Sequence, residues 1–173
     1  MTKLAKYRTI CKPPRITKKS APWEKAYIAG LVDAKGSLAI YPSKPRRSVR
    51  QQLMTAVSLN GHDINELRMV QERYGGVIRI AGRSKQKHTT LYRLLIHRKS
   101  DIVFLITDIS RYLMAKSKQA DLLLKYCRSR LETLQSVEHH SLAPITEEER
   151  SIARELIRLN RKCRNQKHWI AIR

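Results

Sequence analysis

The sequence predicts an α+β fold in which a four-stranded antiparallel sheet is covered on one face by helices. Two observations predict it. Four short segments alternate apolar and polar side chains in pairs, as the strands of two hairpins do. The segments before, between and after these pairs repeat their apolar residues at helical spacing. The expected element order is helix, strand, strand, helix, strand, strand, helix, helix, with a further C-terminal helix.

The first expected element is a helix from Trp23 to about Ala34. Trp23, Tyr27 and Leu31 lie at i, i+4 and i+8 and form one apolar stripe. A second set of small residues is also spaced by four, namely Ala26, Gly30 and Ala34. Small side chains at this spacing allow two helix backbones to approach closely. Glycine in a helix interior costs about 1 kcal/mol relative to alanine, so Gly30 indicates close packing, against the sheet or against another helix.

The strands are expected at Ser37 to Ser43, Arg50 to Asn60, Val77 to Arg83 and Thr89 to His97. Alternation places one set of side chains toward the core. That set is Leu38, Ile40, Leu53, Val57, Leu59, Ile78, Ile80, Tyr92, Leu94 and Ile96. The opposite face of both hairpins is polar and basic.

The remaining helices have recognisable beginnings. Asp63 and Glu66 form the pattern of an N-cap with its capping-box partner, and Gly75-Gly76 ends that helix. Apolar helices follow from Ser100 to about Ile109 and from Lys116 to about Leu131. A second capping-box pattern, Thr146 to Glu149, opens the C-terminal helix. We therefore expect a flexible basic arm over residues 1–21, a core domain over 22–135 and a helical extension over 136–173.

Charge points to a polyanionic partner. The chain carries 36 Lys and Arg against 14 Asp and Glu, a net charge of +22, with 42% apolar residues. Neutralising phosphates releases counterions, so such a chain favours nucleic acid. No acidic residue occurs from Ala34 to His62 or from Arg73 to Ser100, the two windows that hold the predicted strands. On charge alone, a ribosomal-type structural protein is an equal alternative.

Duplex DNA is the favoured polyanion. A two-stranded β-ribbon fits the major groove, and no aromatic pair has the spacing that stacks RNA bases. We expect the sheet face to contact DNA through Ser37, Ala39, Tyr41, Ser43, Lys44, Arg46, Arg47, Arg50, Gln52, Ser58, Arg79, Arg83, Lys85, Lys87 and Arg93. Three widely spaced cysteines and no long apolar run favour a reducing compartment, cytoplasmic or organellar, without membrane insertion or secretion.

The stretch Ile28-Ala-Gly-Leu-Val-Asp-Ala-Lys-Gly36 resembles the signature of the LAGLIDADG homing endonucleases, with eight of nine positions identical or conservative. Tyr74-Gly-Gly-Val and Tyr112-Leu-Met-Ala-Lys-Ser-Lys-Gln-Ala120 are similar to later landmarks of the family, so the resemblance covers about residues 23 to 130. It implies a saddle-shaped DNA-binding sheet and motif helices that pack together at a two-fold axis. Ala26, Gly30 and Ala34 would line that contact. A single motif without an internal repeat implies a homodimer on a long, near-palindromic site.

The resemblance also implies Mg²⁺-dependent hydrolysis of both DNA strands, with a carboxylate at the eighth motif position as metal ligand. That position is Lys35. An ammonium has no lone pair for a metal. Two such groups ~4 Å apart near the axis would repel by about 4 kcal/mol at an effective dielectric of 20. Asp33 matches a position that orders the helix end.

Three other positions retain parts of the expected site. Lys116 matches the family's basic residue beside the scissile phosphate, Asn60 lies near a position that organises water, and the backbone carbonyl of Ala34 could still bind metal. We expect DNA binding with weak or absent cleavage, and weakened Mg²⁺ binding. Lys35 is compatible with a natural loss of cleavage and with a deliberate replacement. The alternative function is a non-cleaving binder of the same fold, either an intron RNA maturase or a DNA-binding regulator.

Overall fold

The computed structural model of the chain describes residues 10–11, 21–43, 52–83, 89–135 and 144–162. Its elements are β1 (Ile10–Cys11), α1 (Pro22–Lys35), β2 (Gly36–Pro42), β3 (Leu53–Gly61), α2 (Ile64–Tyr74), β4 (Val77–Arg83), β5 (Thr90–Ile96), α3 (Lys99–Ile109), the 3-10 turn η2 (Ser110–Tyr112), α4 (Ser117–Gln135) and α5 (Glu147–Lys162). The predicted order of helices and strands is confirmed. The short strand β1 has no counterpart in the prediction.

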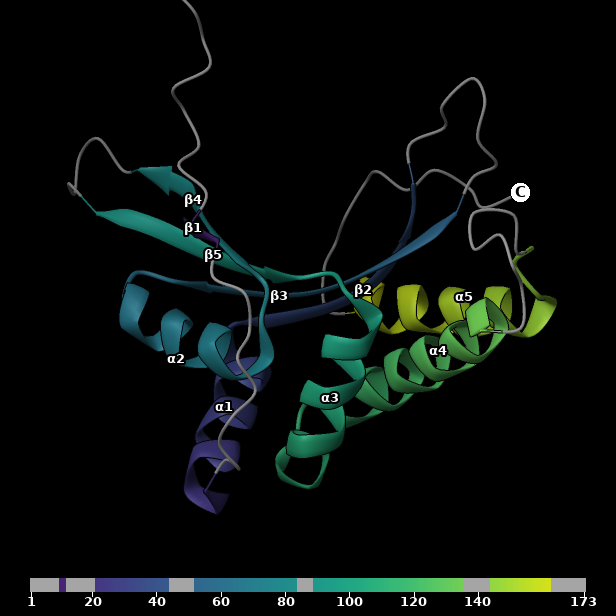
Figure 1. The fold of residues 1–173 in the computed structure, drawn as a ribbon, viewed down its shortest axis with the longest axis horizontal. Coiled ribbons are helices and arrows are strands. Elements are labelled where there is room, and N and C mark those ends of the chain that lie inside the picture. The colour runs from purple at the N-terminus through teal and green to yellow at the C-terminus, as the bar shows by residue number, and fades with distance from the viewer. Residues whose placement is uncertain (1–9, 12–20, 44–51, 84–88, 136–143, 163–173) are drawn as a thin grey trace, which may run out of the picture.

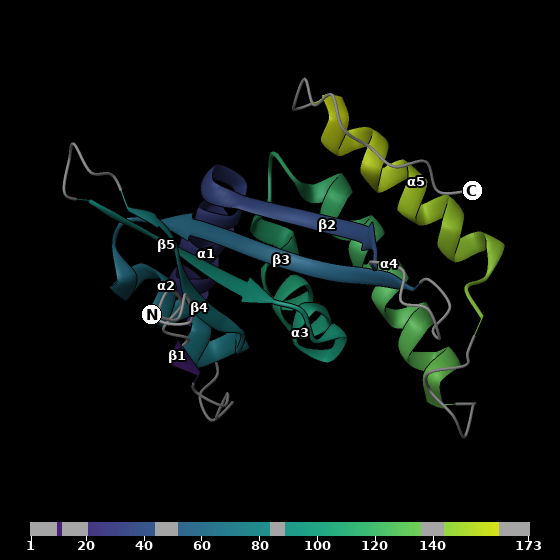
Figure 2. The ribbon, with the colours of Figure 1, turned by 90° about the horizontal axis from the view of Figure 1, so that it is seen from above.

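The strands form one antiparallel sheet in the order β1-β4-β5-β3-β2. The sheet is strongly curved, and α1, α2, α3, α4 and α5 all lie on its convex side (Figure 1). Seen from the concave side, the long strands β2 and β3 cross the middle of the molecule, with α4 and α5 beyond the edge strand β2 (Figure 2). One face of the sheet is therefore packed and the other is open.

The two faces follow from the strand register. Leu38 of β2 lies opposite Val57 of β3, and Leu59 of β3 lies opposite Leu94 of β5. All four are buried against the helices. The predicted inward residues of the second hairpin are also on this side, with Ile78 and Ile96 fully buried and Tyr92 packed at the margin of the core. The expected α+β fold is confirmed. The predicted inward faces of the strands are also observed, except that Ile80 is only partly buried beside a shift in the β4–β5 pairing.

The outer stripe of α1, formed by Trp23, Tyr27 and Leu31, lies mostly outside this core. Ile28 and Val32 of α1 are buried, whereas Trp23 is 68% exposed and Tyr27 is 45% exposed. The predicted apolar stripe thus reaches the core only at Leu31. Since helical spacing shows which residues share a face but not what that face contacts, the sequence could not distinguish a core stripe from an open one.

The C-terminal helix α5 packs on α4 and against β2. Its predicted capping box is confirmed, because the backbone N–H of Glu149 donates to Thr146 Oγ1 (3.1 Å) and that of Thr146 donates to Glu149 Oε2 (2.9 Å). Arg130 of α4 approaches the buried Glu149 carboxylate at 3.6 Å. Near the end of α5, Asn160 donates to the carbonyl of Leu38 on β2 (2.8 Å). Among the described residues, every helix is too short or too polar to cross a membrane.

Candidate nucleic-acid interface

The open face of the sheet carries small side chains, serines and alanines, in its centre. Ser37 and Ser58 lie opposite each other across β2 and β3, followed by Ala39 opposite Ala56. Tyr41 then lies opposite Met54, which is 37% exposed. Because these side chains are short, they project little from the middle of the concave face. A partner bound there could come close to the backbone.

Two arginines face each other further along the same face. Arg79 of β4 and Arg93 of β5 are cross-strand partners, and both are exposed. Within the described part of the chain neither forms an ion pair, and Arg93 Nε donates to Asn60 Oδ1 at 2.7 Å. Like charges directly opposite each other destabilise a sheet. An anionic partner would relieve that repulsion, so the pair makes this face a candidate anion-binding surface.

The structure describes only some of the other residues predicted to contact DNA. The side chain of Ser43 accepts the backbone N–H of Gln52 (3.0 Å), which closes the first hairpin beyond β2. Arg83 follows an irregularity in the pairing between Ile80 and Gly82, and its side chain lies outside the described set. Six predicted phosphate or base contacts also lie outside the described residues, namely Lys44, Arg46, Arg47, Arg50, Lys85 and Lys87.

The C-terminal end of α1 joins the sheet to the start of α4. The Asp33 carboxylate accepts the backbone N–H groups of Met114 (2.7 Å), Ala115 (3.2 Å) and Lys116 (2.9 Å). In return, the ammonium of Lys116 donates to the carbonyls of Val32 (3.1 Å) and Asp33. Asp33 is thus committed to ordering this junction, and the partly buried Lys116 is held at the end of the motif helix.

Lys35 reaches across to α2. Its Nζ lies 2.8 Å from Glu66 Oε2, and the hydroxyl of Tyr27 lies 3.4 Å from Glu66 Oε1. The hydrogen bond that Lys35 donates to the Glu66 carboxylate raises the pKa of Lys35, so the ammonium is the stable form. Asp63 caps α2 as predicted, with its carboxylate on the backbone N–H of Asn65 (2.8 Å). Glu66, however, is engaged with α1 through both carboxylate oxygens, which its capping-box pattern did not predict.

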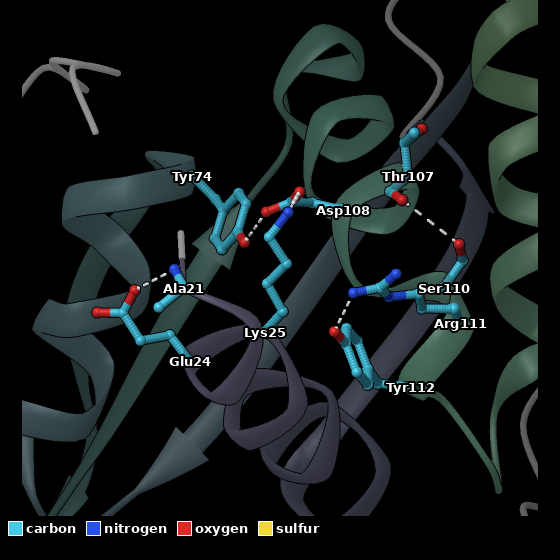
Figure 3. A network of polar contacts seen from close by, with 9 residues as sticks. All are labelled: Ala21, Glu24, Lys25, Tyr74, Thr107, Asp108, Ser110, Arg111 and Tyr112. Atoms are coloured by element: carbon cyan, nitrogen blue, oxygen red, sulfur yellow. Dashed lines mark hydrogen bonds and ion pairs between the residues drawn. The ribbon is translucent and has the colours of Figure 1, made fainter. Parts of the chain in front are cut away.

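Polar contacts fix the other end of α1 between α2 and α3. The ammonium of Lys25 pairs with Asp108 of α3, which also accepts the hydroxyl of Tyr74 (2.8 Å; Figure 3). On the α2 side, Glu24 pairs with Arg73 and accepts the backbone N–H of Ala21. Tyr74 is buried and the four ion-pair partners are partly buried, so the orientation of α1 is set on both flanks while its outer stripe stays open.

A divalent metal does not fit the side chains at this junction. Lys35 offers no lone pair and is already paired, and both oxygens of the Asp33 carboxylate already accept backbone N–H groups, three in all. No group of three or more His, Cys, Asp or Glu side chains that could hold a metal occurs among the described residues. The backbone carbonyl of Ala34 remains the predicted exception. Mg²⁺ in proteins usually binds through one or two carboxylates together with phosphate and water oxygens, so this carbonyl alone does not supply the protein part of such a site.

The fold is a curved antiparallel sheet with its helices on the convex side and an open concave face that carries the Arg79–Arg93 pair (Figure 1). The family model described as LAGLIDADG endonuclease matches residues 28–127, more than half of the chain. The chain belongs to that family of DNA-cleaving hydrolases. A search of curated proteins found no match.

Solved structures share the fold. An archaeal intron-encoded homing endonuclease complexed with DNA is 16% identical with a TM-score of 0.59, covering 85% of this chain and 87% of the other. The homing endonuclease I-CvuI, complexed with its target in the presence of Ca, is 19% identical with a TM-score of 0.60, covering 86% and 87%. The group I intron-encoded homing endonuclease I-CeuI, complexed with DNA, is 16% identical with a TM-score of 0.57, covering 87% and 70%.

Proposed function

We propose that this chain binds a long, near-palindromic DNA duplex as a homodimer, and that Lys35 leaves it with little or no Mg²⁺-dependent cleavage. The observation that carries the proposal is the ion pair of Lys35 with Glu66. In the family, the position of Lys35 is expected to supply the metal-binding carboxylate. A chain that keeps the recognition surface but has a Glu66-paired ammonium at this position can bind DNA without holding the metal that activates water.

The DNA-binding part of the proposal rests on the concave sheet face. That face carries the Arg79–Arg93 pair, and the relatives with this fold are described as DNA complexes. Recognition by such a face combines phosphate contacts, which supply most of the salt-dependent affinity, with base contacts that supply specificity.

The homodimer rests on the outer stripe of α1. Trp23 and Tyr27 are large and exposed, and a side chain added at Gly30 would meet nothing within 4 Å. The predicted interface residues Ala26, Gly30 and Ala34 are exposed beside them. An open apolar stripe with small residues every four positions is suited to a second copy of the same helix.

The test uses the DNA that joins the two flanks of the gene's host intron, or of its other insertion site. The protein, Lys35→Glu and Lys35→Glu/Glu66→Gln are each incubated with this duplex and Mg²⁺. The double variant is included because Lys35→Glu alone would place two carboxylates side by side. Lys118→Glu, a charge reversal at an exposed lysine of α4, is the matched control.

We expect the protein to bind without cleaving and at least one Lys35→Glu form to cleave both strands. Cleavage by the unaltered protein would refute the proposed impairment. Binding without cleavage by every form would mean that the fold serves recognition alone. Tighter binding of folded intron RNA than of the duplex, at matched salt, would instead identify a maturase.

A further inference from the structure

Glu66 of α2 makes its side-chain contacts outside its own helix. It belongs to the first turn of α2, where Asp63 already caps the helix. Its carboxylate turns to α1 instead, reaching Lys35 through one oxygen (2.8 Å) and Tyr27 through the other (3.4 Å). The Lys35 side chain is 44% exposed, and an ion pair so exposed contributes little to folding.

Both partners of Glu66 lie on α1 near the surface offered to a second copy. Tyr27 is part of the open stripe, and Lys35 follows Ala34 at the end of that stripe. A two-fold axis at this surface would bring the two Lys35 ammonium groups toward each other while removing water from them. Like charges repel more strongly as water is excluded.

We propose that Glu66 is the counter-charge that allows two α1 helices bearing Lys35 to pack together. It holds each ammonium on its own subunit and cancels its charge, so that the paired helices meet as neutral ends. Tyr27, which belongs to the open stripe, is the second residue of α1 that contacts this carboxylate. This inference rests on the homodimer proposed above and assigns to Glu66 a positioning role at the interface.

The Lys35–Glu66 ion pair predicts that substitutions at the two positions have non-additive effects on dimerisation. Glu66→Gln would leave two unneutralised ammonium groups at the axis, and Lys35→Met would leave two unneutralised carboxylates. Each single change should therefore weaken self-association. The double variant removes both charges of the pair on each subunit, so it should associate nearly as well as the unaltered protein.

The experiment measures the dimer dissociation constant of the full chain by sedimentation velocity over a range of concentrations. We expect each single change to weaken the dimer about tenfold, and the double variant to return to within about threefold. Raising the salt concentration should shrink the effect of each single change, since it screens the uncompensated charges. Glu72→Gln, at an exposed glutamate of the same helix, is the control and should leave the constant unchanged.

Urea unfolding of each variant establishes that the fold is retained, because an exposed ion pair should change stability only slightly. Effects of the two single changes that simply add in the double variant would overturn the role of Glu66 while leaving the homodimer intact. A protein that stays monomeric at every concentration, with and without its duplex, would overturn the homodimer itself and the role of Glu66 with it.

Discussion

Asp33 and Lys116 hold each other through main-chain groups on both sides. The backbone N–H of Lys116 donates to the Asp33 carboxylate at 2.9 Å, and the Lys116 ammonium donates to the Asp33 carbonyl. Two residues 83 positions apart thereby join the end of α1 to the start of α4. The relative placement of the motif helix and α4 depends on this junction.

Replacing Asp33 should therefore destabilise the whole chain. Asp33→Ala removes the acceptor of three backbone N–H groups, and hydrogen bonds to a charged group each contribute about 1.5–3 kcal/mol. Because water can reach these exposed amides after the change, we expect a loss near the lower end, about 2–3 kcal/mol. Urea unfolding measures it. Asp121→Ala, at an exposed aspartate of α4, is the control. An equal effect of both changes would contradict a special role for Asp33.

The Arg79–Arg93 pair should have opposite effects on folding and on binding. Arg79→Gln relieves repulsion between cross-strand partners, so it should stabilise the free chain by about 0.2–1 kcal/mol. The same change should weaken DNA binding by about 1–3 kcal/mol and relax specificity at one base pair in each half-site, if Arg79 contacts a base.

Unfolding in urea and titration with a set of single-base-pair variants test both parts of this prediction. Arg68→Gln, an exposed arginine of α2 on the helical side, should alter neither property much. An equal loss of affinity for every sequence would make Arg79 a phosphate contact. A loss of stability together with unchanged binding would remove it from the interface.

Asn60 is expected to act through Arg93. Its side-chain oxygen accepts Arg93 Nε at 2.7 Å, which fixes the guanidinium on the open face. Asn60→Ala should weaken DNA binding less than Arg93→Ala does, and the double variant should be no weaker than Arg93→Ala alone. DNA titrations of the three variants measure this. Additive losses would show that Asn60 acts independently, as in its predicted role of organising water.

Cys127 should be unreactive until the chain unfolds. Burial raises the pKa of its thiol to about 12, although nearby Lys99 acts in the opposite direction. The thiolate is the reactive form, and its fraction at pH 8 is then very small. We expect a Cys11→Ser/Cys163→Ser variant to react with a disulfide reagent at pH 8 only in urea. Rapid reaction of the native protein would show that α4 does not seal the core.

The element order could be predicted because local signals agree with the fold. The Asp63 cap and the Gly75-Gly76 stop bound α2 within one residue of its observed range. Both glycines have positive φ, which other residues rarely adopt. The strand β1 could not be predicted, since two residues carry no periodicity and its pairing with β4 is a long-range contact.

The sequence predicted two parts of the site. The Asp63 cap follows from a local pattern, and the role of Asp33 in ordering the end of α1 follows from the family resemblance. The pattern of Asp63 and Glu66 is the usual one for a capping box, and a local pattern cannot show that Glu66 instead meets a lysine 31 positions away. The exposure of Trp23 and Tyr27 could not be predicted either. The same helical spacing occurs in an apolar stripe that packs on a sheet and in one that faces water. In both cases the helix was predicted correctly, and what could not be predicted was which distant residues its side chains contact.

The contact between Asn160 and Leu38 gives the C-terminal helix a protective role. β2 is an edge of the sheet, and an uncovered edge can recruit a strand from another molecule. Because α5 packs against β2 and Asn160 occupies the Leu38 carbonyl, that edge is closed to such pairing. We therefore expect a chain shortened before α5 to leave the edge of β2 uncovered and to aggregate more readily than the full chain.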